Sequence, residues 1–414
     1  MRIVYQNVAG LDVHKRVIAA AIIVQREDGQ WQREGRSFGT MTSDLLKLSD
    51  WLMGHRVTHV AMESTGEYWK PVFNILEDSF EVIVVNAQHL SRVPGRKTDQ
   101  SDAEWIVELM QYGLLKASFI PPAGQRELRE LTRYRNTFIQ ERATLANRVQ
   151  KVLESANIKL ASVATDVLGV SGRAMLDAII AGQASPEEMA ELAKGRMREK
   201  QEALTKALEG RVKTHHRFIL TELLCQIDSL DETIARFDHE IEAYSRPFEE
   251  AVVLLDTIPG VARRTAEVLI AEIGTDMSRF PTAKHLAAWA GVAPGNNESA
   301  GRRRSGKTRQ GNKPLGAALN QAAHAAAHTK NTYLSAQYHR LARRIGKNKA
   351  IVAVAHSILV IAYHLIKRNE PYHELGGDYF DKRNPEVTAK HLVKRLEQLG
   401  FMISLQKTAV TPVL

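Results

Sequence analysis

The sequence predicts an α/β domain of about 120 residues, followed by a long and mostly helical remainder. Short apolar runs typical of strands alternate with helical patterns before residue 122, and from residue 125 the apolar positions keep a helical spacing instead. The 414 residues are 44% hydrophobic and 25% charged, which indicates two or three domains with cores of their own and excludes a disordered or collagenous chain.

The first domain, residues 1–122, is predicted to be a layered α/β structure. Its first helix has leucines at helical spacing and starts at Thr42 or Ser43, which are both good N-cap residues. The run EVIVV at 81–85 is typical of a buried strand. The expected strands cover 7–12, 16–24, 33–39, 57–62 and 81–85, and the expected helices cover 42–53 and 67–76, with another helix after them.

The middle region, 123–248, is predicted to be a helical coiled-coil or oligomerisation region. Two long helical patterns are separated by about 70 residues, which favours an antiparallel hairpin or an oligomerisation arm. Between them, Ser185 and Pro186 mark the start of a shorter helix. The second long pattern repeats in heptads through Leu223, Ile227, Leu230, Ile234, Phe237, Ile241 and Tyr244.

Residues 249–370 are expected to form a third, mostly helical domain, and 371–414 a docking tail whose last helix starts at Asn384. The turn at 258–261 resembles a helix-hairpin-helix, in which a glycine turn presents N–H groups to a phosphate. An ordinary helical turn explains the motif equally well by itself, but the basic stretch beside it favours the helix-hairpin-helix. The apolar stretch 350–366 contains two histidines and a serine, so we expect a buried core helix there and no membrane span.

The charge distribution predicts a polyanionic partner. Lys and Arg exceed Asp and Glu by 56 to 47, and the 71 residues from Ser299 to Asn369 contain 14 Lys and Arg but no acidic residue. Nucleic acid is the simplest such partner, and a solvated basic face is the alternative. The single cysteine, Cys225, and an N-terminus without an apolar signal core predict a cytoplasmic, nucleoid-associated protein.

Four carboxylates stand where they could carry chemistry. Asp12 lies on an apolar strand, Glu63 directly follows another, and Asp99 and Asp102 are three residues apart at the start of a helix. Such a cluster needs a cation, and its hard oxygen ligands suit Mg²⁺ or Mn²⁺. Alternatively, Asp99 or Asp102 caps the helix and Glu63 is an exposed strand end.

The sequence resembles the DEDD-type insertion-sequence transposases over nearly its whole length. The resemblance is carried first by GLDVHK at 10–15, MESTGEYW at 62–69 and KTDQSDAEW at 97–105. It continues in TIPGVARRTAEVLIAEIG at 257–274 and in the segment 280–315. It implies a ribonuclease H-like, RuvC-like N-terminal domain and a C-terminal transposase domain of 249–370.

The resemblance also implies roles for individual residues. Asp12, Glu63, Asp99 and Asp102 match the family's metal-binding tetrad, and Ser299 matches its serine nucleophile on DNA. From the residues alone Ser299 is a turn serine in a Gly- and Asn-rich loop, and Ser305 is the second candidate. The residues expected to contact phosphates are Arg302, Arg303, Arg304, Lys307, Arg309 and Lys313.

The predicted function is therefore that of a transposase or site-specific recombinase of an insertion element. The resemblance implies an element-encoded guide RNA and a homo-oligomer, a dimer or tetramer, acting on DNA, with no membrane partner. A metal-dependent junction or single-strand nuclease using activated water is the alternative, and a nonenzymatic nucleic-acid-binding protein is a third possibility. His324 and His328 have the spacing of a zinc pair, but packing or phosphate contact is a simpler role for them.

Overall fold

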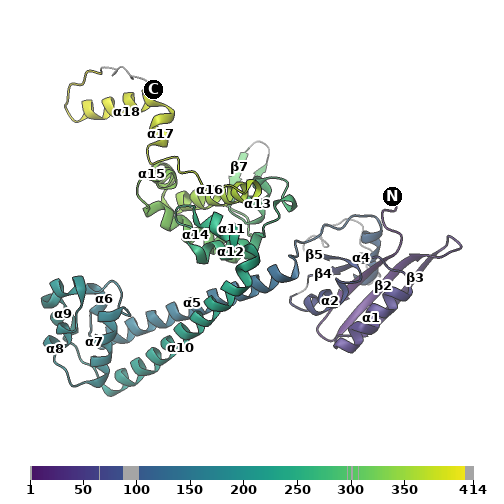
Figure 1. Cartoon of the computed structure of the whole chain (residues 1–414), viewed down its shortest axis with the longest axis horizontal. Helices are drawn as coiled ribbons and strands as arrows, with labels where there is room; N and C mark the ends of the chain where they lie inside the picture. Colours follow the sequence, from purple (N-terminus) through teal and green to yellow (C-terminus); the bar gives the residue numbers. More distant parts are fainter. Residues whose placement is uncertain are drawn as a thin grey trace. The chain divides into compact units, whose positions relative to one another are not determined.

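The computed structural model describes residues 2–64, 66–86, 102–295 and 307–405, together with the backbone of 297–299 and 302–305. The chain divides into two compact units, Met1–Pro121 and Pro122–Leu414 (Figure 1). The division falls at two consecutive prolines, which cannot donate the backbone hydrogen bonds that would continue a helix or strand across it.

The first unit contains a mixed sheet, whose strand order within the described residues is β3-β2-β1-β4-β5. The first three strands are antiparallel neighbours, whereas β1, β4 and β5 run parallel. This is the ribonuclease H-like sheet that the family resemblance implied. The strands are β1 (Val8–Val13), β2 (Val17–Gln25), β3 (Trp31–Gly39), β4 (His59–Glu63) and β5 (Glu81–Val85).

Helices cover both faces of this sheet. Leu11, Val60 and Met62 point to one face and pack with α1 (Thr42–Gly54) and α2 (Trp69–Leu76). Val8 and Ala61 point to the other face and pack with α4 (Asp102–Gln111). Alternate residues of each strand therefore build two separate cores. The start of α1 agrees with the prediction, but its N-cap is Met41, which makes no side-chain capping bond.

The second unit contains a helical hairpin of α5 (Ala123–Ser155) and α10 (Thr214–Ser245). The two helices run antiparallel, because Arg135 contacts Asp238, Arg142 contacts Asp231 and Ser155 contacts His216. In these three pairs the residue number rises on one helix as it falls on the other. The expectation of an antiparallel hairpin is confirmed.

The heptad positions of α10 pack within this same chain. Ile227, Ile234 and Ile241 are buried, and Phe237 packs against Phe138 of α5 at a ring distance of 5.2 Å. Since α5 of the same chain covers these positions, this seam needs no helix from another protomer.

Short helices close the distal end of the hairpin around a core of their own. The helix at Ser185 has a full capping box: its hydroxyl accepts from the Glu188 N–H at 3.2 Å, and its own N–H donates to the Glu188 carboxylate at 2.7 Å. These elements are α6 (Leu160–Val163), α7 (Val170–Ala181), α8 (Pro186–Glu191), the 3₁₀ helix Gly195–Lys200 and α9 (Gln201–Leu208).

The remaining helices pack around α16 (Lys347–Arg368). Among the described helices, α16 alone has the length and hydropathy to cross a membrane. Its apolar residues, including Val354, Ile358 and Leu359, are buried in the core of this domain, as predicted for a core helix. The other elements are α11 (Glu249–Asp256), α12 (Arg263–Ile273), α13 (Ala283–Trp289), β6 (Asn297–Ser299), β7 (Arg302–Ser305), α14 (Lys313–His328) and α15 (Tyr333–Ile345), with 3₁₀ turns at Arg246–Phe248 and Met277–Arg279.

The tail docks on this domain before it ends in two helices, α17 (Tyr379–Arg383) and α18 (Pro385–Gln398). The Tyr372 N–H donates to the Thr257 hydroxyl at 3.0 Å, and the Tyr333 N–H donates to the Glu374 carboxylate at 2.7 Å. The docking segment and the helix start at Asn384-Pro385 agree with the prediction.

Candidate active site

Asp12 and Glu63 occupy equivalent positions on two neighbouring parallel strands. Leu11 of β1 is in register with Met62 of β4, so the next residue on each strand is a carboxylate. Parallel strands lie about 4.8 Å apart, and residues in register point to the same face of the sheet. Leu11 and Met62 face the core beneath α1 and α2, so Asp12 and Glu63 face the opposite side, on which α4 packs.

Asp102 begins α4 on that same side. The helix lies unusually close to β1 at Gly10, where a β-carbon would be only 2.4 Å from the carbonyl oxygen of Ala103. Glycine is thus required at position 10 for this approach. Since Asp102 precedes Ala103, the close packing positions its backbone on the face that carries Asp12 and Glu63.

The surroundings of Asp12 are partly open to solvent. Its side chain is 18% exposed and its Oδ2 lies 3.1 Å from Nε2 of His14. Asp99, the fourth predicted acid, lies outside the described residues. In the part of the chain that is described, no three His, Cys, Asp or Glu side chains form a group that could hold a metal ion.

Ser299 is the last residue of β6 in a short antiparallel hairpin. Ser299 is in register with Arg302, and Glu298 with Arg303, across a connection of two residues. The second candidate serine, Ser305, lies opposite Asn297 at the other end of the ladder. The backbone pairing therefore brings the predicted nucleophile and the first arginine of the basic run together at the tip of one hairpin.

The base of the hairpin is fixed to the helical core. Gly291 and Gly311 cross so closely that a β-carbon on Gly291 would lie 2.7 Å from the Gly311 nitrogen. Asn312 then caps α14 by accepting from the Leu315 N–H at 3.1 Å, and it donates to the buried carboxylate of Glu272 at 2.6 Å. The hairpin thus projects from an anchored base.

The residues predicted to contact phosphates divide into two groups. Lys307, Arg309 and Lys313 are exposed near this base. Arg302, Arg303 and Arg304 belong to β7, where only the backbone is described. The arginines therefore lie in the hairpin that carries Ser299, and the other three residues follow it in the sequence.

Helix packing accounts for the turn that resembles a helix-hairpin-helix. Gly260 has φ of +87° and meets α14 so closely that a β-carbon would be 2.4 Å from the Ala322 carbonyl oxygen. This contact supports the ordinary helical turn that the sequence left open. His324 and His328 are exposed on α14, and Nδ1 of His328 lies 2.8 Å from the His324 carbonyl oxygen. This contact involves the helix backbone, and neither histidine is part of a described metal-binding group.

Sequence reasoning missed two buried ion networks that join α5 to α12. Arg133 donates two hydrogen bonds, of 2.7 and 2.9 Å, to fully buried Glu272. Arg135, only 3% exposed, contacts Glu267 at 2.7 Å. Burial lowers the pKa of Arg129 to about 10, although the nearby Glu272 carboxylate opposes that shift. The sequence did contain a signal for the first network: Glu272 lies inside the apolar run VLIAEIG at 268–274. A charge that is buried with such a run requires a partner of opposite charge.

Comparison with known proteins places this geometry in a family. Residues 9–158 match a model of DEDD-type IS110 transposases, and residues 252–340 match the model of the transposase IS116/IS110/IS902 family. The transposase for insertion sequence element IS1111A of Coxiella burnetii is 25% identical over 77% of this chain and 80% of its own length. The pilin gene-inverting protein of Moraxella bovis is 31% identical over 34% of this chain and 45% of its own.

A solved structure of Thermus thermophilus RuvC with a Holliday junction substrate covers 27% of this chain and all of its own, at 13% identity and a TM-score of 0.20. The two family matches define the chain as a DNA-rearranging enzyme of the transposase class. More particularly, it carries the N-terminal and C-terminal domains of IS110-family insertion-sequence transposases.

Proposed function

We propose that this transposase cuts and rejoins DNA at the ends of an insertion element with the carboxylates Asp12, Glu63, Asp99 and Asp102 and the serine Ser299. The observation that supports this most directly is the register of the sheet. It makes Asp12 and Glu63 neighbours on the face over which α4 begins at Asp102. Acidic side chains that come from three separate elements to one face of a sheet are the kind of donors that a shared divalent cation neutralises.

The donor set fits Mg²⁺ or Mn²⁺. The three described acids offer only carboxylate oxygens, which are the ligands that these hard cations prefer, whereas a zinc site would favour His or Cys. A bound divalent ion would supply Lewis-acid stabilisation of charge on the scissile phosphate. Asp12, Glu63 and Asp102 would hold it at the edge of the sheet, with Asp99 as the fourth ligand.

The proposed chemistry at Ser299 is a transesterification. The serine oxygen forms a bond to phosphorus as the bond from phosphorus to one DNA oxygen breaks, and the serine proton is given up while the leaving oxygen gains one. The phosphodiester is conserved as a link between serine and DNA, so rejoining needs no external energy source. Arg302, Arg303 and Arg304, with the exposed Lys307, Arg309 and Lys313, would hold the DNA backbone near the hairpin tip.

The partners in this proposal are DNA, both element ends and target, and a guide noncoding RNA encoded by the element. The domain division is 1–122 for the nuclease-like domain, 123–248 for the helical arm, 249–370 for the serine-bearing domain and 371–414 for the tail. A dimer or tetramer, with the arm as the assembly element, is part of this proposal. Cytoplasmic action on the nucleoid follows from the substrate.

The deciding experiment is to trap a protein–DNA adduct. Purified protein is incubated with Mg²⁺, labelled DNA carrying the element's own ends, and RNA transcribed from the noncoding DNA beside the coding sequence. Denaturing gels should show a labelled covalent adduct, and mass spectrometry should assign it to Ser299. Ser299→Ala should abolish the adduct and Ser305→Ala should keep it. Cleavage without any adduct, undiminished in Ser299→Ala, would favour the nuclease that uses activated water.

A further inference from the structure

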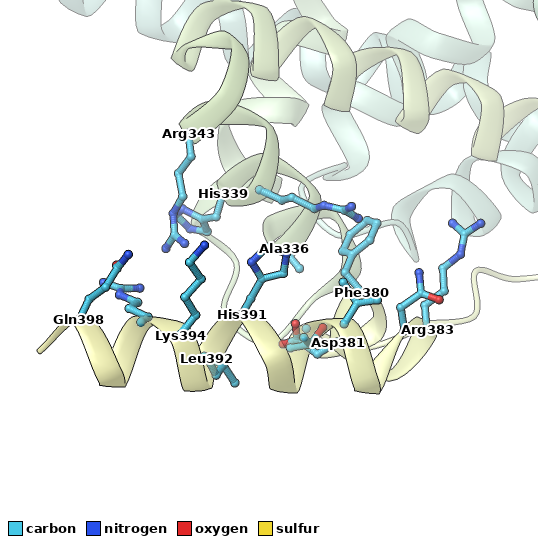
Figure 2. A pocket seen from close by; sticks show the side chains of 16 residues that line it. Ala336, His339, Arg343, Phe380, Asp381, Arg383, His391, Leu392, Lys394 and Gln398 are labelled. Atoms are coloured by element: carbon cyan, nitrogen blue, oxygen red, sulfur yellow. The ribbon is translucent and has the colours of Figure 1, made fainter. Parts of the chain in front are cut away.

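A large groove separates α15 from the two tail helices α17 and α18 (Figure 2). Its volume is about 1220 Å³, and most of its lining lies beyond residue 340, where the match to the transposase family model ends. The groove is therefore built chiefly by a part of the chain to which the family match assigns no role. Its cationic lining residues are Arg340, Arg343, Arg383, Lys394 and Arg395.

The charge in this groove is strongly unbalanced. Among the described residues that line it, five Lys and Arg side chains are accompanied by one carboxylate, that of Asp381. His339 and His391 add two further groups that can carry positive charge. Cations stand on both walls, since Arg343 belongs to α15 and Lys394 to α18. Like charges that face each other across a groove repel unless an anion lies between them.

Apolar packing does not explain why α18 lies opposite α15. None of the residues of α18, a helix that is described throughout, is buried. Its His391 and Lys394 point toward α15, whereas Leu392 points away (Figure 2). The helix thus presents His391 and Lys394 to the basic wall, and none of its apolar residues is buried against α15.

An aromatic ring lies among these cations. The Arg340 guanidinium lies 4.8 Å from the centroid of the Phe380 ring, and Phe380 stacks on Tyr333 at 5.4 Å. The ring thereby holds one of these cations in place. Rows of cations along a channel are typical of proteins that follow a nucleic-acid strand, because the cations meet successive phosphates. A single small anion would not need cations on both walls.

We propose that the groove between α15 and α18 binds the phosphodiester backbone of a nucleic acid, as a second binding surface besides the β6–β7 hairpin. This inference rests on the proposed function insofar as that function supplies DNA and RNA as partners. The phosphates would neutralise both walls and hold α18 in place. The tail would then enlarge the nucleic-acid-binding surface of the enzyme without taking part in the chemistry.

The test measures binding by the full-length protein without any reaction. The variant Arg343→Gln/Lys394→Gln removes one charge from each wall. The control Lys47→Gln/Lys206→Gln removes two exposed lysines that each pair with a carboxylate of their own helix. Affinities for a fluorescent 30-base-pair DNA duplex and a 30-nucleotide single-stranded RNA are measured from 50 to 300 mM salt. Circular dichroism and Tm establish that both variants are folded.

The groove variant should flatten the slope of log Kd against log salt by about 1.8 on duplex DNA or about 1.4 on single-stranded RNA, and the control should not. The probe whose slope changes identifies which nucleic acid occupies the groove. Slopes equal to wild type on both probes would overturn the inference. So would a loss of binding to phosphatidylserine vesicles with nucleic-acid slopes unchanged, since the basic helix would then serve a membrane surface. Neither result bears on the Ser299 adduct, so the two proposals fail separately.

Discussion

Gly10 of β1 and Ala103 of α4 lie in direct backbone contact: a β-carbon on Gly10 would be 2.4 Å from the carbonyl oxygen of Ala103. The same β-carbon would be 2.5 Å from the Val107 nitrogen. Both neighbours are helix backbone and cannot rotate away as a flexible side chain could. The contact couples the strand that carries Asp12 to the helix that begins at Asp102, so the sheet–helix packing and the candidate metal site depend on the same glycine.

Gly10→Ala should therefore impair both stability and activity. Moving α4 away from β1 should cost about 1–3 kcal/mol of unfolding free energy, as overpacking does in other cores, and should displace Asp102 from Asp12. Urea unfolding and metal-dependent DNA cleavage measure the two effects. Gly35→Ala on β3 is the matched control, because its β-carbon would meet its nearest atom at an ordinary 3.7 Å. If the two variants had the same unfolding free energy and the same cleavage activity, the close contact at Gly10 would not be required for the packing of α4.

Asp12→Asn should abolish strand exchange while leaving the fold intact. The substitution keeps the shape of the side chain but removes the charge that a divalent ion needs. Calorimetry should show Mn²⁺ binding weakened at least tenfold, and EDTA should reduce the wild type to the activity of the variant. Asp28→Asn, at an exposed turn where Oδ1 accepts from the Gln30 N–H, should behave as wild type. Full activity of Asp12→Asn in EDTA would refute a metal role for this acid.

Glu272 should prove essential for holding the hairpin base to the helical arm. Glu272→Leu would leave the donors of Arg133 and Asn312 without their buried acceptor. Breaking such a pair costs about 3–5 kcal/mol, and denaturant unfolding should show a loss of that size. Glu232→Gln, on an exposed pair at 4.0 Å from Arg236, should change stability by less than about 1 kcal/mol. If Glu272→Leu also lowered the unfolding free energy by less than about 1 kcal/mol, apolar packing alone would hold the arm and the hairpin together.

The elements of the first unit were predictable because each follows from local patterns. Short apolar runs located β1 and β2, and the run EVIVV matches the bounds of β5. Glu63 was expected just after its strand, but β4 includes it, because pairing with Val85 of β5 continues to that residue. Strand register is a property of two segments, so it cannot be obtained from either one alone.

The candidate site was only partly predictable for the same reason. A charge within an apolar strand marked Asp12 and an acid at a strand end marked Glu63, whereas the family resemblance was needed for Ser299. The need for Gly10 beneath α4, and for Arg133 beside Glu272, depends on residues far apart in the sequence. The heptads of α10 correctly indicated a helical partner, but periodicity does not reveal whether that partner is in the same chain. Here it is α5, which begins at Ala123.

Removing the arginines at the hairpin tip should weaken DNA binding in a salt-dependent way. Arg302→Gln/Arg303→Gln/Arg304→Gln should flatten the slope of log Kd against log salt by about 2–3, close to one for each phosphate that an arginine no longer neutralises. Lys47→Gln/Lys159→Gln/Lys206→Gln removes three exposed lysines that each pair with a nearby carboxylate, and it should leave the slope unchanged. Fluorescence anisotropy at several salt concentrations distinguishes the two, and equal slopes would mean that the arginines do not bind DNA.

Finally, we expect the complete site to be shared between two chains. Asp12 and Ser299 belong to separate compact units on either side of the paired prolines at 121 and 122. The test mixes two inactive proteins, Asp12→Ala and Ser299→Ala, each with a different affinity tag so that mixed oligomers can be isolated. In a shared site, Ser299 of the first chain meets Asp12 of the second.

Strand exchange should then return in part in the mixed oligomers, because some of their sites contain both wild-type residues. The covalent adduct should form only on the Asp12→Ala chain, which is the one that keeps the serine. If each site instead uses the residues of one chain, no mixture can contain an intact site. Mixed oligomers that stay inactive, beside a wild-type oligomer that is active under the same conditions, would therefore assign Asp12 and Ser299 to the same chain.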